Sequence, residues 1–237
     1  DVYKRQAHGT QGATPKYLTE FKSHFPSRGY VLNWLGLNFR SQQGIIRSAH
    51  SLILGIPAVS MLAPASAANE ECIPVEVHEL TASTFMRLFS TRYAAGDTIL
   101  ILAANPDDYR LSEPFVNVVV EQDKLENPNN RRVRVRAAQR SKGLEADTVI
   151  VLGDFVAATS TWAKNQIFRA ARTIDTDDQS PFDVISQNEL YKLANISICR
   201  ARSRAAWLIA KDPGDGVHRL KASSRIGNVQ GSFIDYR

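Results

Sequence analysis

Continuous apolar runs along the chain predict buried strands. Such runs, in place of strict alternation, are typical of central parallel strands that are covered on both faces. We identify three of them, at residues 98–103, 116–120 and 148–152. Further strands are expected at 30–35, at 73–77, where apolar residues alternate, and at 206–210.

Between these runs, apolar residues recur at the helical period. Ile45, Ile46 and Ala49 predict a helix that Ser41 caps and Gly55 ends. Similar patterns predict helices after Thr14, around 85–96, at 162–172 and at 190–201. Strands alternating with helices indicate an α/β fold with a parallel sheet flanked by helices. Functional residues are then expected in loops at the carboxyl ends of the strands.

Two absences limit what the chain can do. The most apolar stretch, 51–68, is interrupted by Gly55, Pro57 and Pro64. A spanning helix needs about 20 apolar residues, so we interpret this stretch as a helix end and a buried loop and expect no membrane partner. Nothing reads Gly-x-x-x-x-Gly-Lys-Ser/Thr. The chain therefore has no phosphate-binding loop of its own, and nucleotide chemistry would require a partner domain.

Composition adds little to this picture. The 237 residues are 43% hydrophobic and 22% charged, which describes a soluble globular chain with a sizeable core. The 29 basic and 24 acidic side chains give a net charge of +5, which permits a polyanionic partner without requiring one. Cys72 and Cys199 match no metal-ligand spacing, so we expect free thiols, no metal site and a cytoplasmic location.

Three loop segments carry candidate chemistry: Leu37-Asn38-Phe39-Arg40-Ser41, residues 139–145, and residues 199–204. The planar fork of an arginine can hold two phosphate oxygens, and a reaching arginine accelerates phosphoryl transfer. Arg40 and Arg200 are candidates for that role. Taken singly, either could be a surface arginine or a helix-end cation. Likewise Phe39 could be a core residue, Lys142 and Gly143 a simple turn, and Glu145 a solvated acid.

Taken together and in order, the three segments resemble motifs IV, V and VI of superfamily 1 helicases of the UvrD/Rep type. The first segment resembles that family's Asn-Tyr-Arg-Ser sequence with its following helix. Residues 140–147 resemble its Ser-Lys-Gly-Leu-Glu-x-Asp motif, and residues 195–202 its Thr-Arg-Ala-Arg segment. Residues 12–26 look like the helix that joins motifs III and IV. The resemblance covers residues 12–211.

The resemblance implies the second of two RecA-like domains that clamp ATP between them. Arg40 and Arg200 would then reach the γ-phosphate as catalytic residues. Phe39 would pack on the adenine and Glu145 would hold the ribose, beside Lys142 and Gly143 in the same cofactor-binding turn. ATP and Mg²⁺ would be held mainly by a missing N-terminal domain of the same polypeptide.

The resemblance also implies contact with single-stranded DNA. The candidates are Gln139, which stands where the family usually has a histidine, and its neighbours Arg136, Arg140 and Ser141. They belong to an acid-free run, 131–142, that contains six basic residues. Such a run suits a groove that tracks a phosphate backbone. Its alternative interpretation is an edge strand that charge protects from aggregation.

The expected organisation is an artefactual or disordered segment at 1–11, the helicase domain at 12–211 and a tail at 212–237. Residues 153–187 are expected to form an inserted loop with one helix. The leading hypothesis is an ATP-dependent DNA helicase domain that is inactive alone. The alternative is a non-catalytic nucleic-acid-binding module derived from the same fold.

Overall fold

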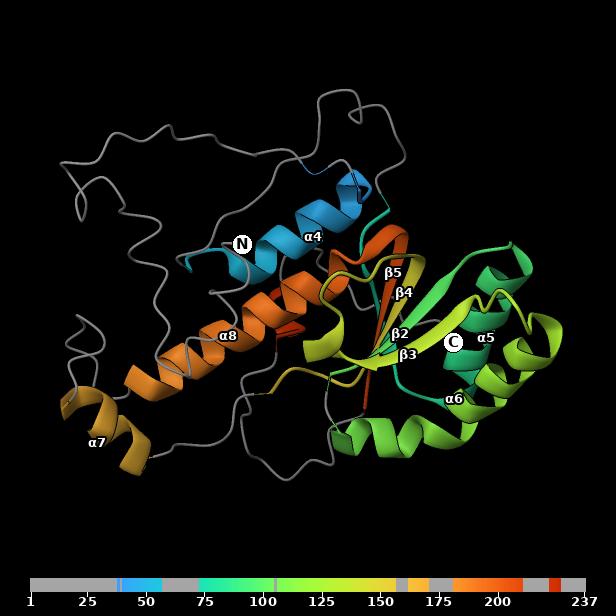
Figure 1. Cartoon of the computed structure of the whole chain (residues 1–237). Coiled ribbons are helices and arrows are strands. Elements are labelled where there is room, and N and C mark those ends of the chain that lie inside the picture. The colour runs from blue at the N-terminus through green and yellow to red at the C-terminus, as the bar shows by residue number, and fades with distance from the viewer. Residues whose placement is uncertain are drawn as a thin grey trace, which may run out of the picture.

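The computed structural model describes residues 38, 40–56, 73–104, 106–156, 162–170, 181–210 and 222–226. These residues contain one five-stranded sheet in the order β1-β5-β4-β2-β3, and all its strands run parallel (Figure 1). The strands are β1 (Glu76–Glu79), β2 (Ile99–Ala103), β3 (Val133–Ala137), β4 (Ala146–Leu152) and β5 (Ala201–Ile209). The predicted α/β fold with a parallel sheet is confirmed.

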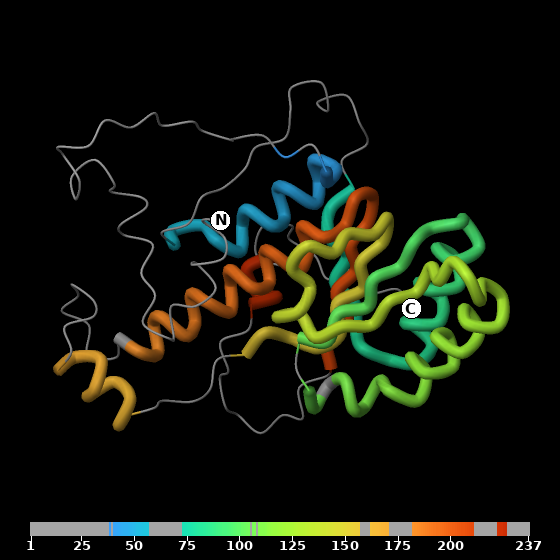
Figure 2. The backbone as a smooth tube through the Cα atoms, viewed as in Figure 1, coloured from blue at the N-terminus to red at the C-terminus, as the bar shows by residue number. Residues whose placement is uncertain are grey.

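Helices cover both faces of the sheet (Figures 1 and 2). One face carries α4 (Gln43–Ile53) and α8 (Pro181–Ile198), and the other carries α5 (Ala82–Ala94) and α6 (Pro106–Glu126). A shorter helix, α7 (Trp162–Ala170), packs against α8. This covering explains why β2 and β4 consist almost entirely of apolar residues, because neither face of a central strand meets water.

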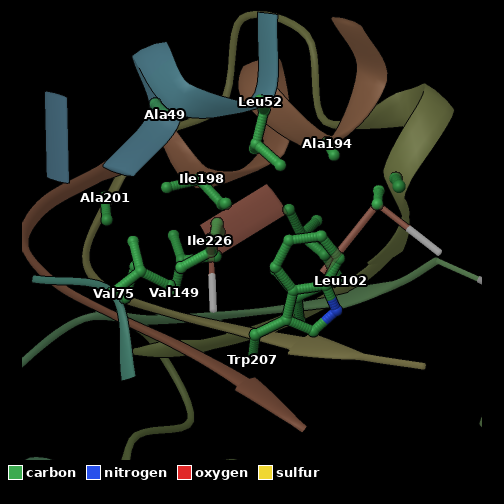
Figure 3. Close-up of a cluster of buried hydrophobic side chains, with 14 of the residues drawn as sticks. Ala49, Leu52, Val75, Leu102, Val149, Ala194, Ile198, Ala201, Trp207 and Ile226 are labelled. Atoms are coloured by element: carbon green, nitrogen blue, oxygen red, sulfur yellow. The ribbon is translucent and has the colours of Figure 1, made fainter. Parts of the chain in front are cut away.

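The core on the α4 and α8 side is built around Trp207 of β5 (Figure 3). Its ring packs edge-on against Phe155, with the ring centroids 5.6 Å apart. Its indole N–H donates to the carbonyl of Gly153 at 2.7 Å, which satisfies the one polar atom of a fully buried side chain. Ala49 and Leu52 reach the same cluster from α4. This packing anchors α4 on the sheet.

The core on the α5 and α6 side contains Phe85, Phe89 and Tyr93 of α5, one helical turn apart. Thr81 begins α5 by accepting a hydrogen bond from the backbone N–H of Thr84 at 3.1 Å. Gly96, with φ of +91°, follows the helix end, as the sequence predicts.

The predicted strand at 116–120 is wrong, because these residues lie within α6. Val116 and Val119 are fully buried while Val118 is 58% exposed, which is a helical and not a strand pattern. Each valine costs a helix roughly half a kcal/mol or less relative to alanine, and packing against α5 and the sheet outweighs that cost. The high valine content of this segment therefore led to the wrong prediction of a strand.

Several predicted boundaries also shift. Ser41 does not cap α4, because Gln42 occupies the N-cap position and its side chain makes no capping bond. The helix predicted at 190–201 begins earlier, at Pro181, and the expected helix at 162–172 is confirmed as α7. The helix predicted after Thr14 and the strand predicted at 30–35 lie outside the described residues.

Among the described residues, no helix is both long and apolar enough to cross a membrane.

Candidate functional site

The candidate site lies at the amino ends of β4 and β5. Glu145 immediately precedes β4, Arg202 is at the start of β5, and Arg40 precedes α4. In the register of the sheet, Ala146 of β4 lies opposite Ala201 of β5, so these two strands start together. The expectation that functional residues follow the carboxyl ends of strands is therefore wrong for this cluster. Glu145 precedes its strand and Arg202 is the second residue of its own, and parallel strands align their amino ends.

A carboxylate shared by two arginines forms the centre of the site. The Nε of Arg40 donates to Oε2 of Glu145 at 3.0 Å, and an Nη of Arg202 donates to Oε1 of the same carboxylate. The side chains of Arg40, Glu145 and Arg202 are 42%, 40% and 48% exposed. The hydrogen bond from Arg202, with the charges of both arginines, lowers the pKa of Glu145. A ligand in solution can therefore reach an ionised, doubly paired carboxylate.

Asp147 holds the far side of Arg202. An Nη of Arg202 lies 3.6 Å from Oδ1 of Asp147. The other oxygen, Oδ2, accepts from the backbone N–H of Thr98 at 2.9 Å and from its hydroxyl at 2.6 Å. These bonds from Thr98 lower the pKa of Asp147, with a further contribution from Arg202. The cluster is thus anchored to the start of β2 at its Asp147 end.

A tight turn brings Glu145 to this position. The hydroxyl of Ser141 donates to the carbonyl of Ala138 at 2.7 Å, and Leu144 N–H donates to the carbonyl of Ser141 at 3.0 Å. Gly143 lies in this turn with φ of +81°, where a side chain would strain the backbone. Lys142 and Gly143 are exposed, so the predicted cofactor-binding turn lies at the surface beside Glu145.

The segment that carries Arg40 is tied to the end of α8. The side-chain oxygen of Asn38 accepts from the backbone N–H groups of Arg40 and Ser41, at 2.9 and 3.2 Å. The hydroxyl of Ser41 donates to the carbonyl of Cys199 at 3.5 Å, and Gln42 N–H donates to the carbonyl of Arg202 at 2.9 Å. The backbone of Arg40 is therefore fixed relative to β5. Phe39, expected on the adenine, lies outside the described residues.

The side chain of Arg200 donates to backbone carbonyls. Its Nε donates to the carbonyl of Ile196 at 3.0 Å, and an Nη lies 3.5 Å from the carbonyl of Leu144. These bonds satisfy a free carbonyl of the last turn of α8 and tie that helix to the turn before Glu145. Burial raises the pKa of the neighbouring Cys199 thiol to about 11, so this thiol stays protonated near neutral pH.

The structure places the nucleic-acid candidates along the connection that leads from β3 to the Glu145 turn. Gln139 and Arg140 are exposed on a short 3-10 helix, η3 (Ala138–Arg140), which follows the carboxyl end of β3. Arg136 is exposed on β3 itself and donates to the carbonyl of Val135 at 2.7 Å. Because β3 and β4 are parallel, the connection between them must return across the sheet to reach Glu145. Ser141, within this connection, is fully buried and is not presented to DNA.

Sequence reasoning missed Arg202, Asp147 and Thr98 as site residues. Arg202 follows Arg200 by two positions, and this spacing places it on β5 instead of at the end of α8. The available signal was the pattern at two strand starts: Arg202 lies at the start of β5, and the acid Glu145 precedes β4, the neighbouring parallel strand. Thr98 gave none, because its partner Asp147 is 49 residues away.

The cluster suits an anion better than a metal. Two arginine forks meet at an exposed carboxylate, and guanidinium groups pair readily with phosphates and carboxylates. Among the described residues, no group of three or more His, Cys, Asp or Glu side chains could hold a metal ion.

No protein-family model matches the sequence, and no curated protein matches it either.

Proposed function

We propose that this chain is the second RecA-like domain of an ATP-dependent DNA helicase of superfamily 1, acting in the cytoplasm. The observation that carries the proposal is the meeting of separate motif segments at one carboxylate. Glu145 binds Arg40, 105 residues away, and Arg202, 57 residues away. All three lie in segments that resemble helicase motifs, and the five-stranded parallel sheet is consistent with a RecA-like domain.

In this proposal the chain supplies positive charge to a nucleotide held mainly by another domain. Arg40 is 42% exposed and its segment is fixed to β5, so its guanidinium can reach outward from a rigid base. Glu145 would accept from a ribose hydroxyl, with Lys142 and Gly143 in the adjoining exposed turn. Arginines that neutralise charge on a transferred phosphoryl group can contribute about 10³ to 10⁵ in rate. ATP and Mg²⁺ would enter with the N-terminal domain.

One observation favours a second candidate function. Arg200, the other proposed catalytic arginine, donates to backbone carbonyls within its own domain. A non-catalytic module that binds single-stranded DNA would require no reaching arginine at this position. In that case Arg200 would only hold α8 to the turn before Glu145.

The experiment compares variants of the intact parent polypeptide in DNA-stimulated ATP hydrolysis. Arg40→Ala and Arg200→Ala should each lower the turnover number by about a thousandfold or more, with nucleotide binding largely retained. Arg204→Ala removes a charge from β5, four positions after Arg200, and should leave turnover near wild type. The chain alone should hydrolyse no ATP. Robust hydrolysis by the chain alone, or unimpaired turnover in both variants, would overturn the proposal.

A further inference from the structure

The two arginines on Glu145 are held unequally. Arg202 also contacts Asp147, whose other oxygen is fixed by Thr98, so its guanidinium lies between two carboxylates. The ion pair of Arg40 within the described residues is with Glu145 alone. The polar contacts therefore run from Thr98 through Asp147, Arg202 and Glu145 to Arg40. Arg40 is the last residue in this series, so it can leave Glu145 while the other contacts stay in place.

Glu145 occupies the position that an anionic ligand of Arg40 would need. A carboxylate oxygen 3.0 Å from Nε is a geometric substitute for a phosphate oxygen. The pair is exposed to solvent on both sides, 42% and 40%, so it is inexpensive to break. A polyphosphate offers more negative charge than one carboxylate and can replace it.

We propose that Glu145 is the internal counter-ion that Arg40 exchanges for a polyphosphate, and that Arg202 is the positioning residue that retains Glu145 during this exchange. The identification of the polyphosphate with that of ATP rests on the proposed function. Without Arg202, Glu145 would have Arg40 as its remaining arginine and would compete more strongly with the ligand. Arg202 thus makes Arg40 available without itself binding the ligand.

The chain provides matched controls for each part of this exchange. Arg204 lies two residues further along β5 and pairs with Glu76, with 3.7 Å between Nη1 and Oε1. Arg204→Ala therefore removes the same charge from the same strand without touching Glu145. Glu76→Gln removes one negative charge, as Glu145→Gln does, but from the Arg204–Glu76 pair.

The test measures binding of inorganic tripolyphosphate, without Mg²⁺, to the full chain by titration calorimetry at low salt. Glu145→Gln should bind tripolyphosphate about two- to fivefold more tightly than wild type, the equivalent of losing one exposed ion pair. Glu76→Gln should match wild type. Arg202→Ala should weaken binding more than Arg204→Ala does, and Arg202→Lys should recover part of the loss.

The decisive comparison repeats Arg202→Ala in the Glu145→Gln background. If Arg202 acts by holding Glu145, its removal there should cost no more than removal of Arg204. If Arg202 binds the ligand directly, its removal should cost more in that background than in wild type, which would overturn the positioning role. Tripolyphosphate binding by none of the variants, or equal affinities of Glu145→Gln and Glu76→Gln, would overturn the exchange.

These outcomes are separable from failure of the proposed function, because the titration involves neither hydrolysis nor DNA. If Arg202→Ala and Glu145→Gln have independent effects on tripolyphosphate binding, the helicase proposal still stands. Unimpaired ATP turnover in the Arg40 variant of the parent would remove ATP as the ligand and leave the measured exchange in place. Cooperative urea unfolding of each variant checks that the substituted chains are still folded under the conditions of the titration.

Discussion

At the scale of single residues, Asp123 of α6 is a buried acid, 1% exposed, that accepts several hydrogen bonds. Its carboxylate accepts from the backbone N–H groups of Arg132 and Val133, each at 3.0 Å, and from the hydroxyl of Tyr93 at 3.0 Å. Asn127 donates to it as well. One buried acid therefore fixes the turn that leads into β3.

We expect Asp123→Ala to destabilise the chain by about 3 kcal/mol or more, because several buried donors lose their acceptor together. The free energy of unfolding in urea measures this. Glu121→Gln changes an exposed acid on the same helix and should cost less than about 0.5 kcal/mol. Equal losses in the two variants would show that the Asp123 bonds contribute nothing specific.

Glu76 predicts a pH dependence of stability. Its hydrogen bond with His78, at 3.1 Å, and the nearby charge of Arg204 lower the pKa of this carboxyl. A carboxyl with a lowered folded-state pKa stabilises the fold above its ordinary pKa of about 4.3, and this contribution disappears as the pH falls through the folded-state value. Glu76→Gln should therefore lower stability at pH 7, and this loss should shrink as the pH is lowered through the folded-state pKa. Urea unfolding across an acidic pH series checks this, and exposed Glu79→Gln should change stability little across the same series.

At the scale of elements, a close contact at Gly44 sets the position of α4, the helix that Arg40 precedes. A side chain added at Gly44 would meet the backbone oxygen of Ile73 at 2.1 Å, so α4 crosses the segment before β1 at the distance that only glycine allows. The backbone at Ile73, just before β1, thus sets how close α4 lies to the sheet. It also sets where Arg40, just before the helix, can lie.

Gly44→Ala makes this contact measurable because propensity and packing predict opposite signs. In an open helix the change should stabilise by about 1 kcal/mol. Here it should destabilise by about 1 to 3 kcal/mol, because backbone atoms must move apart. Urea unfolding gives the sign, and Gln43→Ala, the adjacent helix position, is the control. A more stable Gly44→Ala chain would show that α4 adjusts without cost.

The elements also show what sequence periodicity can and cannot predict. Residues 148–152 form a strand as predicted, because every position is covered by helices and an unbroken apolar run is required. Residues 116–120, Val-Asn-Val-Val-Val, are similarly rich in β-branched apolar residues but belong to a helix that begins at Pro106, ten positions earlier. Pro106 at the first turn and apolar Tyr109, Val116 and Val120 at helical spacing predict the helix, but only over a window longer than the run itself.

At the scale of the whole molecule, the sequence predicts individual residues of the site but not which of them pair with one another. The sequence nominates Arg40 and Glu145 separately, and their pairing needs a fold that joins positions 105 residues apart. Arg202 joins them because β5 and β4 are neighbours in the sheet although β5 follows a long helix. Sheet order, which no local pattern encodes, therefore decides which of several arginines belongs to the site.

Sheet order also places the basic run at an edge. Among the described strands, β3 pairs only with β2, and Arg134 and Arg136 are exposed on it. Both arginines share the sheet face of their register partners Leu100 and Leu102. They therefore lie on the face that carries α4 and α8, at its open margin. The edge position is compatible with a DNA-tracking surface and with simple protection from aggregation.

Salt dependence distinguishes these two roles of the β3 arginines. If both contact phosphates, the double variant Arg134→Ala/Arg136→Ala should weaken binding of single-stranded DNA at every sequence. The plot of log affinity against log salt should also become shallower, by about 0.7 for each lost phosphate contact. Fluorescence anisotropy with an oligonucleotide across a salt series measures both quantities, and exposed Arg110→Ala on α6, which removes one positive charge away from β3, is the control. An unchanged slope, with increased aggregation of the double variant, would assign the arginines to edge protection, because only counter-ion release makes affinity depend on salt in this way.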